Sequence, residues 1–369
     1  MPDTLSPVDQ RYLLAAIRIG AGGLGTTWPN PAVGAVLLNN GRVVSAARTA
    51  AGGRPHAEQQ ALEAAGAQAH GGTLYLSLEP CSHHGRTPPC ADAVVAAKIE
   101  RVVVGALDPD PRVSGAGIAK LRAAGIQVSM PDRQDAAMAA NAGHFQRVRT
   151  GRPWVTLKLA VSSDGMIGRK GSGQVALTGV RASTHVQALR SRYDGILVGS
   201  VTVEADDPQL TCRLPGLEGR SPVRIVLDTN GRLQPAAKIF AATGFVPVLR
   251  FIGAEPPEVG DSAFGDHVKT FAVPVSGGRL DMTAILDRLG DFGLTRVLVE
   301  GGSRIAASLV VQRLVDDAIV FRCPHEIGAD GIPALADMAL SAVETGPDFR
   351  IVGRRRFGDD VMSRYQKAI

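Results

Sequence analysis

The sequence predicts an α/β protein built from two domains. Its 369 residues exceed what a single hydrophobic core ordinarily organises, so two domains are expected. In both halves, apolar runs of strand length alternate with segments of helical periodicity, which is typical of a mostly parallel sheet covered by helices. A polar stretch with Gly and Pro at residues 149–153 interrupts this alternation. We therefore predict domains at residues 1–148 and 154–369, joined by this linker.

The first half is predicted to open with a helix, because Ser6 and Pro7 suit its N-cap and first turn. Asn39-Asn40-Gly41 predicts a hairpin turn, since Asn and Gly tolerate positive φ. The run from Gly20 to Gly25 matches Gly-x-Gly-x-x-Gly, but it follows a helix and not a strand, so we reject it as a dinucleotide-binding motif. The other strands are expected at residues 32–38, 43–47, 73–78, 101–106 and 127–130, and the other helices at 56–65, 90–99, 116–124 and 132–148.

The second half repeats the alternation of strands and helices. Its strands are expected at residues 155–161, 196–199, 223–227, 247–251, 268–273, 296–299 and 318–322, and its helices at 181–193, 282–289 and 305–315. The sequence therefore predicts an α/β layer structure in each half.

Composition narrows the functional class. The net charge is +5, from 40 basic and 35 acidic residues, and no dense Lys/Arg stripe accompanies it, which argues against a nucleic-acid partner. Arg354-Arg355-Arg356, the longest basic run, is expected on a solvated strand edge. The sequence has no apolar run of membrane-spanning length and no signal-peptide pattern. The 4 Cys residues are too few for a disulfide framework, so we expect a reducing compartment, the cytoplasm, with no membrane partner.

The stretch from His56 to Cys90 carries the clearest chemistry. His56, Cys81 and Cys90 offer three soft ligands, which leaves the fourth tetrahedral position of a zinc ion open for water. Glu58 lies two residues after the first ligand, where it can handle the protons of that water without binding the metal. The order His-x-Glu, then Pro-Cys, then a second Cys is the signature of zinc nucleobase deaminases, although here eight residues separate the two thiols.

Other interpretations of this stretch remain open. A structural zinc ion with four protein ligands and a site without metal are both possible. His83 and His84 lie in the polar loop between the thiols, and we interpret them as substrate-facing or solvated, with ligation as the alternative. Asn30, between two prolines, suits recognition of a base or ribose edge, and a turn-forming role competes with this.

A second candidate site begins at Glu300. Glu300-Gly301-Gly302-Ser303 joins a predicted strand to a predicted helix, and the glycines allow close approach of a nucleotide phosphate to the helix N-terminus. A simple tight turn would also explain the two glycines.

These motifs resemble a known family. His56-Ala57-Glu58 together with the segment from Glu79 to Cys90, and the segment from Thr27 to Gly34, are similar to the zinc-dependent pyrimidine deaminases of riboflavin biosynthesis, which belong to the cytidine-deaminase superfamily. The segments 158–165, 205–211 and 299–302 resemble the reductase that is fused to that deaminase and has a dihydrofolate-reductase-like fold. The resemblance covers nearly the whole chain, in the family's domain order.

The resemblance implies a bifunctional enzyme acting on a small pyrimidine ribotide. The first domain would hydrolyse the 2-amino group of 2,5-diamino-6-ribosylamino-4(3H)-pyrimidinone 5′-phosphate with zinc, and the second would reduce the ribosyl group with NADPH. It also implies a homo-oligomer, a dimer or tetramer formed through the reductase domain.

The resemblance further implies the residues of the second site. In the second domain, the positions implied to contact substrate are Gln174, Arg190, Leu210, Arg213 and Glu300. The positions implied to contact the cofactor are Ala160, Ala176, Thr202, Asp206, Thr229, Gly302, Ser303, Arg304, Ile305, Ala306, Ala307 and Ser308. Structural alternatives are a solvated helix residue for Arg190, a loop ion pair for Arg213 and a turn cap for Asp206.

The chain departs from the family pattern at two places. Ala176 stands where many members have an aromatic residue, and His325 stands where a Lys is common. Both departures bear on cofactor affinity. The competing functions are a monofunctional nucleobase or nucleoside deaminase with a non-catalytic C-terminal domain, and a zinc-binding regulator with a fourth protein ligand.

Overall fold

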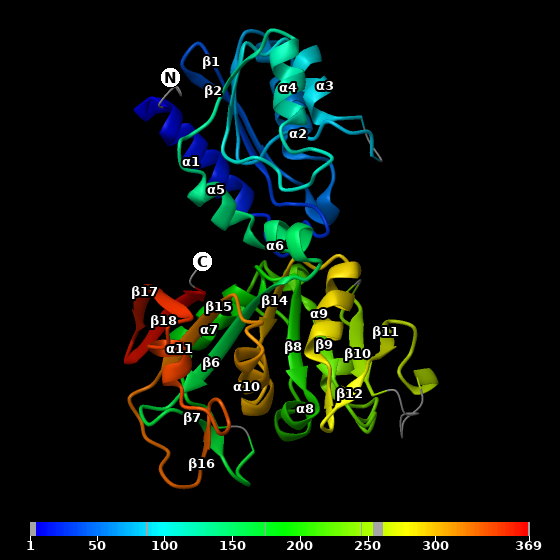
Figure 1. Cartoon of the computed structure of the whole chain (residues 1–369), viewed down its shortest axis with the longest axis vertical. Coiled ribbons are helices and arrows are strands. Elements are labelled where there is room, and N and C mark those ends of the chain that lie inside the picture. Colours follow the sequence, from blue (N-terminus) through cyan, green and yellow to red (C-terminus); the bar gives the residue numbers. More distant parts are fainter. Residues whose placement is uncertain (1–4, 86–87, 174, 245, 254–260, 368–369) are drawn as a thin grey trace. The chain divides into compact units, whose positions relative to one another are not determined.

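The computed structural model describes residues 5–85, 88–173, 175–244, 246–253 and 261–367 (Figure 1). The chain folds as two compact units, Met1–Gly151 and Arg152–Ile369. Each unit has its own sheet with helices packed against it, so the predicted α/β class is confirmed. Within the described ranges, every helix falls short of the length or apolarity that crossing a bilayer requires.

Unit 1 is built on a five-stranded sheet with the order β2-β1-β3-β4-β5. The β1 strand pairs antiparallel with β2 and β3, whereas β3, β4 and β5 are parallel. Helices α2, α3 and α4 pack in sequence on one face, and α1 and α5 pack together on the other (Figure 1). The strands are β1 Gly34–Asn39, β2 Arg42–Arg48, β3 Thr73–Leu76, β4 Arg101–Val104 and β5 Gln127–Ser129. The helices are α1 Pro7–Ala21, α2 Ala57–Ala65, α3 Cys90–Ala96, α4 Ala116–Ala123, α5 Asp135–Ala140 and α6 Ala142–Thr150.

The glycine run after the first helix serves packing. A Cβ on Gly20 would lie 2.6 Å from the backbone nitrogen of Gly34, so only glycine lets α1 approach β1 this closely. The turn between β1 and β2 is confirmed, with Asn40 and Gly41 both at positive φ. The single helix predicted at 132–148 is wrong, because Asn141 (φ −109°) is not helical and separates α5 from α6. Helix α6 also continues through Thr150, into the predicted linker, and ends at Gly151 (φ 82°).

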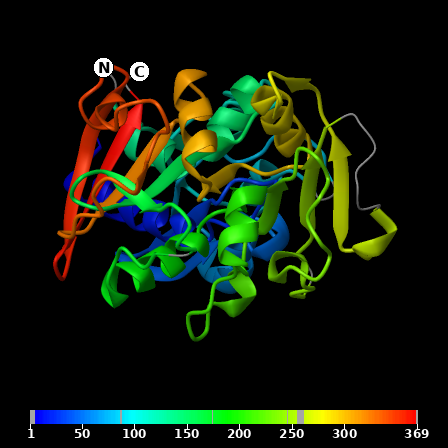
Figure 2. The ribbon, with the colours of Figure 1, turned by 90° about the horizontal axis from the view of Figure 1, so that it is seen from below.

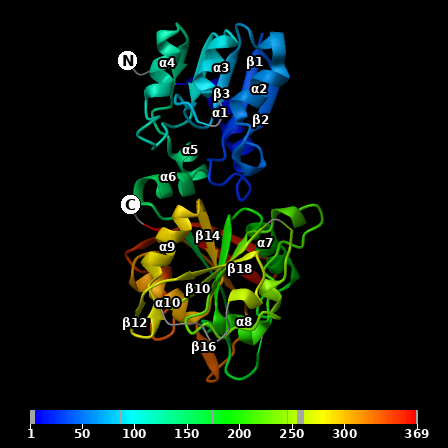
Figure 3. The same cartoon turned by 90° about the vertical axis from the view of Figure 1, so that its right-hand side faces the viewer.

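Unit 2 is built on a nine-stranded sheet with the order β11-β10-β9-β8-β14-β6-β15-β18-β17. Its first seven strands are parallel, and β18 and β17 extend it antiparallel, as a hairpin at the opposite end from β11 (Figure 2). Helices α9 and α10 cover one face, and α7 and α8 the other (Figure 3). The helices are α7 Val180–Arg190, α8 Ser200–Asp206, α9 Met282–Asp291, α10 Ser303–Val311 and α11 Ser341–Glu344.

The strands of the large sheet are β6 Trp154–Val161, β8 Gly195–Gly199, β9 Val223–Leu227, β10 Val248–Ile252, β11 Val268–Ala272, β14 Arg296–Val299, β15 Asp317–Arg322, β17 Phe349–Phe357 and β18 Asp360–Lys367. Two small pairs are formed by β7 Met166–Arg169 with β16 Gly331–Pro333, and by β12 Val275–Ser276 with β13 Arg279–Leu280. Sequence reasoning missed α8, because its Val-Thr-Val content is typical of strands. It also missed β17 as a full strand, although Arg354 to Arg356 lie exposed on this edge strand as expected.

A buried carboxylate joins three elements of unit 1. Asp9, in the first turn of α1, accepts hydrogen bonds from Arg101 at 2.7 and 3.0 Å and from the Tyr75 hydroxyl at 2.9 Å. Its backbone and side chain also form a capping box with Ser6. Burial raises the pKa of Asp9, but the hydrogen bonds from Arg101, Ser6 and Tyr75 outweigh burial and lower the pKa to about 2.

The lowered pKa predicts an acid-sensitive stability term. Because the folded-state pKa lies below the unfolded value of 3.8, the contribution is complete above the unfolded pKa and is lost as pH falls through about 2. We expect it to amount to about 2 kcal/mol. The measurement is denaturant unfolding from pH 7 to pH 2 in a Trp154→Phe background, which leaves Trp28 as the fluorescence reporter of unit 1, since the chain has 2 Trp residues.

The matched variants are Asp9→Asn and Asp92→Asn. Asp9→Asn should lower stability at pH 7 and flatten its dependence on pH below pH 4. Asp92 pairs with Lys120 at the surface, with 40% of its side chain exposed, and its replacement should cost only about 0–1 kcal/mol. Equal pH dependence in the Asp9→Asn variant and the parent would show that this carboxylate is not the titrating group.

Candidate metal centre and reductase site

The three predicted metal ligands come from two helix starts and one strand end. His56 is the N-cap of α2, and Cys90 is the first residue of α3, after Pro89. Cys81 lies in the segment that leaves β3. Sequence positions up to 34 residues apart are therefore brought to one place by the packing of α2 and α3 on the same face of the sheet.

The donor atoms are spaced as a tetrahedral zinc site requires. His56 Nδ1 lies 3.3 Å from Cys90 Sγ and 3.8 Å from Cys81 Sγ. Zinc bonds of about 2.3 Å to sulfur and about 2.0 Å to nitrogen, at the tetrahedral angle, would set the two atoms about 3.5 Å apart. Among the described His, Cys, Asp and Glu residues, only these three join the cluster, with all donor atoms within 4.8 Å of one another. The donor set therefore fits zinc with three protein ligands, and neither His83 nor His84 belongs to it.

The two thiols share their protons unequally. A hydrogen bond with Cys90 lowers the pKa of Cys81 to about 4, and the contact with Cys81 raises the pKa of Cys90. The backbone N–H of Cys90 also donates to Cys81 Sγ at 3.2 Å, which favours a thiolate there. The pair thus holds one proton where a divalent cation would bind, and cation binding would release it.

Glu58 is a buried acid that contacts the thiol of Cys90 and has one carboxyl oxygen without a described partner. Its side chain lies in the first turn of α2, 3% of the residue is exposed, and its Oε2 has no hydrogen bond among the described residues. Burial raises the pKa of Glu58, although the nearby His56 lowers it. A buried carboxyl group with a free oxygen beside a three-ligand cluster is equipped to exchange protons with a molecule bound there.

Glu79 is a positioning residue that sequence reasoning missed. Its buried carboxylate accepts hydrogen bonds from the backbone N–H groups of Asp108, Gly115, Gly117 and Ile118, at 3.0 to 3.3 Å. These bonds tie the segment just before Cys81 to the start of α4. The available signal was an acidic residue directly after an apolar strand and directly before the Pro80-Cys81 pair.

The remaining predicted residues of unit 1 lie in loops. Asn30 Nδ2 donates to the carbonyl oxygen of Gly53 at 3.0 Å, which fixes the amide and leaves Oδ1 without a donor among the described residues. This hydrogen bond supports the structural role proposed for Asn30. Recognition of a base or ribose edge by Asn30 stays a prediction. His83 is half-buried, with its Nδ1 unpartnered among described residues, and His84 is exposed.

In unit 2, the ends of neighbouring parallel strands converge. Glu300 follows β14, and its backbone N–H donates to Leu197 of β8 at 3.0 Å. Arg190 donates to the Glu300 carboxylate through Nε at 2.9 Å and Nη2 at 3.1 Å. Two of the predicted substrate residues thus form one buried ion pair, and Arg190 is not the solvated helix residue of the alternative interpretation.

Lys158 completes this ion pair and was missed as a site residue. Its Nζ lies 3.6 Å from Glu300 Oε2. Burial raises the pKa of Glu300, but Arg190 and then Lys158 outweigh burial and lower it to about 2, so Glu300 is a carboxylate at neutral pH. The signal for Lys158 was its position as the single charged residue of the apolar strand Trp154–Val161.

The predicted cofactor positions gather around α8 and α10. A Cβ on Gly302 would lie 3.6 Å from Thr202 Oγ1, so the starts of α10 and α8 face one another across the ends of β14 and β8. Thr229 follows β9, and its carbonyl accepts from Gly253 at 3.0 Å. Asp206 is half-buried at the end of α8, and burial raises its pKa. Ala160 is partly exposed on β6, and Ala176 is exposed in a loop.

Within the predicted segment from Gly302 to Ser308, the side chains divide between two faces. Ala306 is buried toward the sheet. The Ile305 side chain packs against Gly199 and Gly301, where an added Cβ would lie 2.7 and 3.2 Å from it. Arg304 is exposed, and Ser303, Ala307 and Ser308 are partly exposed.

Two further substrate predictions, Leu210 and Arg213, lie in the segment that follows α8. Leu210 is buried at a positive φ of 54°, and the backbone N–H of the exposed Arg213 donates to Gln187 Oε1 of α7 at 3.1 Å. No described carboxylate pairs with Arg213, which does not support the ion-pair alternative. Gln174 lies outside the described residues.

Two family models match the chain. Residues 7–106 match the model described as "Cytidine and deoxycytidylate deaminase zinc-binding region", and residues 153–363 match "RibD C-terminal domain". Riboflavin biosynthesis protein RibD of Escherichia coli is 36% identical over 364 residues, which cover 96% of this chain and 98% of the relative. The Aquifex aeolicus relative of the same name is 34% identical, over 98% of this chain and 99% of the relative. The chain belongs to the RibD family.

Solved structures extend the match to the whole RibD architecture. Acinetobacter baumannii RibD superimposes with a TM-score of 0.86 at 31% identity, over 98% of this chain and 99% of that one. A Thermotoga maritima protein described as a diaminohydroxyphosphoribosylaminopyrimidine deaminase/5-amino-6-(5-phosphoribosylamino)uracil reductase superimposes with a TM-score of 0.85 at 32% identity, with the same coverage. As a RibD family member, the chain is a bifunctional riboflavin biosynthesis enzyme, with a zinc-binding deaminase unit and a reductase unit that uses NADPH. A monofunctional deaminase is not favoured, because the second unit also matches its enzymatic family.

Because Glu79 accepts four hydrogen bonds beside Cys81, we predict that replacing Glu79 weakens zinc binding. In Glu79→Gln, one carboxylate oxygen becomes an NH2 group that faces backbone N–H donors, so bonds are lost and donors are left buried. We expect unit 1 to lose about 1–3 kcal/mol of stability and the chain to bind zinc more weakly. The measurements are zinc per chain after dialysis against a chelator series, and denaturant unfolding followed through Trp28.

The control for this variant is Glu100→Gln, which changes an exposed acid of the same unit. It should keep wild-type zinc affinity and stability. Wild-type zinc affinity in Glu79→Gln would show that these bonds do not position Cys81.

Proposed function

We propose that unit 1 hydrolyses the 2-amino group of 2,5-diamino-6-ribosylamino-4(3H)-pyrimidinone 5′-phosphate, and that unit 2 then reduces the ribosyl group. The product is 5-amino-6-ribitylaminouracil 5′-phosphate. The observation that carries this proposal is the buried Glu58 carboxyl, which contacts the ligand Cys90 and keeps one oxygen, Oε2, without a described partner beside the three-ligand cluster. A zinc-binding regulator would have no use for such an acid, whereas hydrolysis of an amino group needs one.

The residues of unit 1 divide the hydrolysis between them. His56, Cys81 and Cys90 would hold zinc, which as a Lewis acid lowers the pKa of water bound to it. Glu58 would take up the proton of the attacking water at its carboxylate and return protons to the ring nitrogen and to the departing ammonia. Asn30, whose amide is fixed by Gly53, would orient the substrate through its Oδ1. One water is consumed and one ammonia is released.

The residues of unit 2 would bind and orient the substrate and the cofactor. NADPH supplies the hydride, so no side chain needs to be oxidised or reduced. Glu300, held as a carboxylate by Arg190 and Lys158, can accept hydrogen bonds from sugar hydroxyl groups. Arg190 uses Nε and Nη2 on Glu300, which leaves its remaining nitrogen and the exposed Arg213 for the substrate phosphate. Leu210 and Gln174 would complete the substrate contacts, and Ala160, Ala176, Thr202, Asp206, Thr229 and the segment from Gly302 to Ser308 would contact the cofactor.

We propose further that the chain works in the cytoplasm as a homo-oligomer formed through unit 2. All four cysteines are free thiols in the structure, which suits a reducing compartment. The terminal strand β17 exposes Ile351 and Val352, with 52% and 45% of each residue accessible, at an edge that a second copy could cover. Light scattering of the full chain tests this, and a monomer at all concentrations would contradict it.

Replacement of Glu58 should separate metal binding from hydrolysis. In Glu58→Gln we expect zinc content to stay at wild type, because the side chain does not bind the metal, and ammonia release to fall about 100- to 10,000-fold, because proton transfer is lost. The measurements are zinc per chain and ammonia released from the diaminopyrimidinone phosphate without NADPH. The control is Glu63→Gln, on the exposed side of the same helix. Full ammonia release by Glu58→Gln would refute the assigned role.

The order of the two reactions is tested with the same variant. Wild type should release ammonia without NADPH, and it should oxidise NADPH only after deamination. Glu58→Gln given the diamino substrate should therefore consume no NADPH, and given the deaminated compound it should consume NADPH at the wild-type rate. NADPH oxidation by the variant on the diamino substrate would show that the reductase does not require prior deamination.

Replacement of Glu300 should damage unit 2 alone. Glu300→Gln leaves Arg190 and Lys158 without a compensating anion, and removing one partner of a buried pair costs about 3–5 kcal/mol. We expect unit 2 to lose stability and NADPH oxidation to fall, whereas zinc content and ammonia release stay unchanged. The measurements are unfolding through Trp154 and the two partial reactions, with Glu204→Gln as a control on an exposed ion pair. A parallel loss of ammonia release would contradict separate sites.

A further inference from the structure

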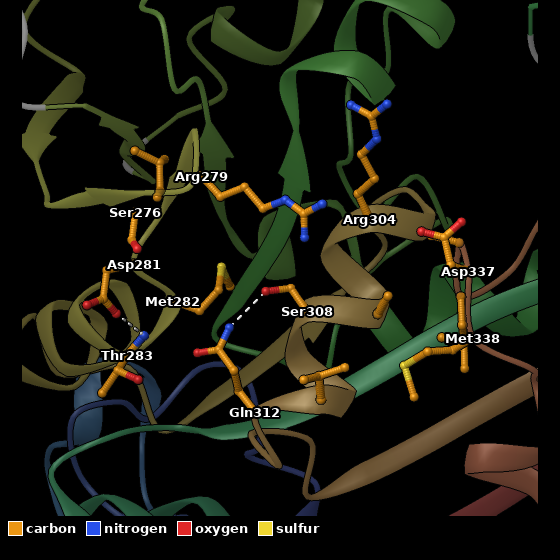
Figure 4. Close-up of a pocket in the computed structure, with 15 residues that line it drawn as sticks. Ser276, Arg279, Asp281, Met282, Thr283, Arg304, Ser308, Gln312, Asp337 and Met338 are labelled. Carbon is orange, nitrogen blue, oxygen red and sulfur yellow. Dashed lines mark hydrogen bonds between the residues drawn. The ribbon is translucent and has the colours of Figure 1, made fainter.

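The cavity beside α10 belongs to the reductase site described above. It has a volume of about 620 Å³, and Arg304, Ala307 and Ser308 of the predicted cofactor segment line it (Figure 4). Figure 4 shows Arg279 reaching toward α10 from the β12–β13 hairpin. A different cluster of buried polar side chains lies in unit 1.

Two polar side chains from distant parts of unit 1 meet in its interior. Asp108 follows strand β4 and is 8% exposed, and His144 lies in the first turn of α6 with 11% of its side chain exposed. His144 Nε2 lies 3.2 Å from Asp108 Oδ1, within hydrogen-bond distance. Because an ionised carboxylate only accepts hydrogen bonds, Nε2 is the donor. The imidazole on α6 is thus tied to the segment that leaves β4.

The oxygen that His144 contacts also shapes a turn. Asp108 Oδ1 accepts a second hydrogen bond from the backbone N–H of Asp110 at 2.9 Å, which is the pattern of an Asx turn. Asp110 Oδ1 then accepts from the backbone N–H of Arg112 at 2.9 Å and from its guanidinium Nε at 3.0 Å. His144 therefore holds the side chain on which residues 108–112, called the Asp108 turn below, are built.

The Asp108 turn lies against the segment that carries the metal ligand Cys81. At one end of the turn, the backbone N–H of Asp108 donates to Glu79 Oε2 at 3.3 Å. At the other end, the Ser82 hydroxyl donates to the carbonyl oxygen of Arg112 at 3.4 Å. Both contacts join residues on either side of Cys81 to the turn, so the turn borders the three-ligand cluster.

The Asp108 turn also brings charged groups to the predicted substrate-facing residue His83. Hydrogen bonds from Arg112 lower the pKa of Asp110, and nearby His83 lowers it further. The Arg112 side chain is 71% exposed, so its guanidinium group can be reached from solvent. Polar and charged groups placed beside a catalytic cluster are suited to orienting a hydrophilic substrate such as a pyrimidine ribotide.

We propose that His144 is a positioning residue of unit 1, which holds the Asp108 turn in the orientation that binds the pyrimidine ribotide. The inference rests on the function proposed for unit 1. Without the His144 bond, the Asp108 side chain is held less tightly, so the turn must be ordered when the substrate binds and affinity falls. The metal cluster stays in place, because Glu79 keeps its three hydrogen bonds from the start of α4.

Ammonia release by the full-length zinc-loaded protein, without NADPH, tests this inference. His144→Phe removes the donor and keeps a planar ring, whereas His144→Gln keeps an N–H group that can reach Asp108. We expect His144→Phe to raise the KM for the diaminopyrimidinone phosphate roughly 10-fold, as for the loss of a hydrogen bond to a charged group, with a much smaller change in kcat. Zinc content should stay at wild type, and His144→Gln should recover part of the affinity.

A double variant tests the route through Asp108. If His144 acts through this carboxylate, His144→Phe combined with Asp108→Asn should raise KM no further than Asp108→Asn alone. Independent, additive effects of the two replacements would contradict the route.

Two control variants separate positioning from stability. Asp9→Asn should weaken unit 1 through Tyr75 and Arg101, away from the Asp108 turn, and it should keep the wild-type KM. His70→Phe changes an exposed histidine of the same unit and should keep both the stability and the KM. Denaturant unfolding followed through Trp28, in the Trp154→Phe background, gives the stability of unit 1 in each variant.

The possible outcomes separate this inference from the function on which it rests. A raised KM in His144→Phe, with partial recovery in His144→Gln, supports the positioning role. A wild-type KM with lowered stability overturns it, since His144 would then serve the fold alone. An equal rise of KM in Asp9→Asn also overturns it, and so does a loss of zinc at wild-type KM. Failure of the wild-type protein to release ammonia from the diaminopyrimidinone phosphate would refute the function proposed for unit 1 itself.

Discussion

Both units depend on the same geometrical constraint: parallel strands direct the residues that follow them to one edge of the sheet. In unit 1, the end of β3 leads to Glu79 and Cys81, and the segment after β4 supplies the Asp108 N–H that Glu79 binds. In unit 2, residues at or after the ends of β6, β8, β9 and β14 include Ala160, Thr202, Thr229 and Glu300. Parallel pairing fixes which loops meet, and local sequence then decides what chemistry they bring.

Three buried glutamates show how partners decide the role of a carboxylate. Glu79 accepts four backbone N–H groups and is therefore a fixed structural anion. Glu300 is balanced by Arg190 and Lys158, so it stays ionised and can bind hydroxyl groups. Glu58 has an oxygen with no described partner and a raised pKa, so it alone is free to exchange a proton. Burial is common to all three, and hydrogen-bond satisfaction distinguishes them.

Helix α10 serves two purposes that its composition separates by face. Ala306 and Leu309 are fully buried against the sheet, and Ile305 fills the space that Gly199 and Gly301 leave open. Arg304, Ala307 and Ser308 face the cavity instead. One face therefore holds the helix rigidly on the sheet, and the other presents polar groups from a fixed position, which suits a binding site.

The sequence by itself determined the α/β class, most helix and strand positions, the three metal ligands and the acid beside them. These follow from periodicity and from ligand chemistry, both of which are local. The tertiary structure decided that His83 and His84 lie outside the cluster, that Asn141 divides a helix, and that Arg190, Lys158 and Glu300 form one buried ion pair. It also placed Arg279 opposite α10, 25 residues before Arg304 in the chain. Such facts are contacts between distant segments, and no local pattern encodes the distance between two side chains until the sheet brings their strands together.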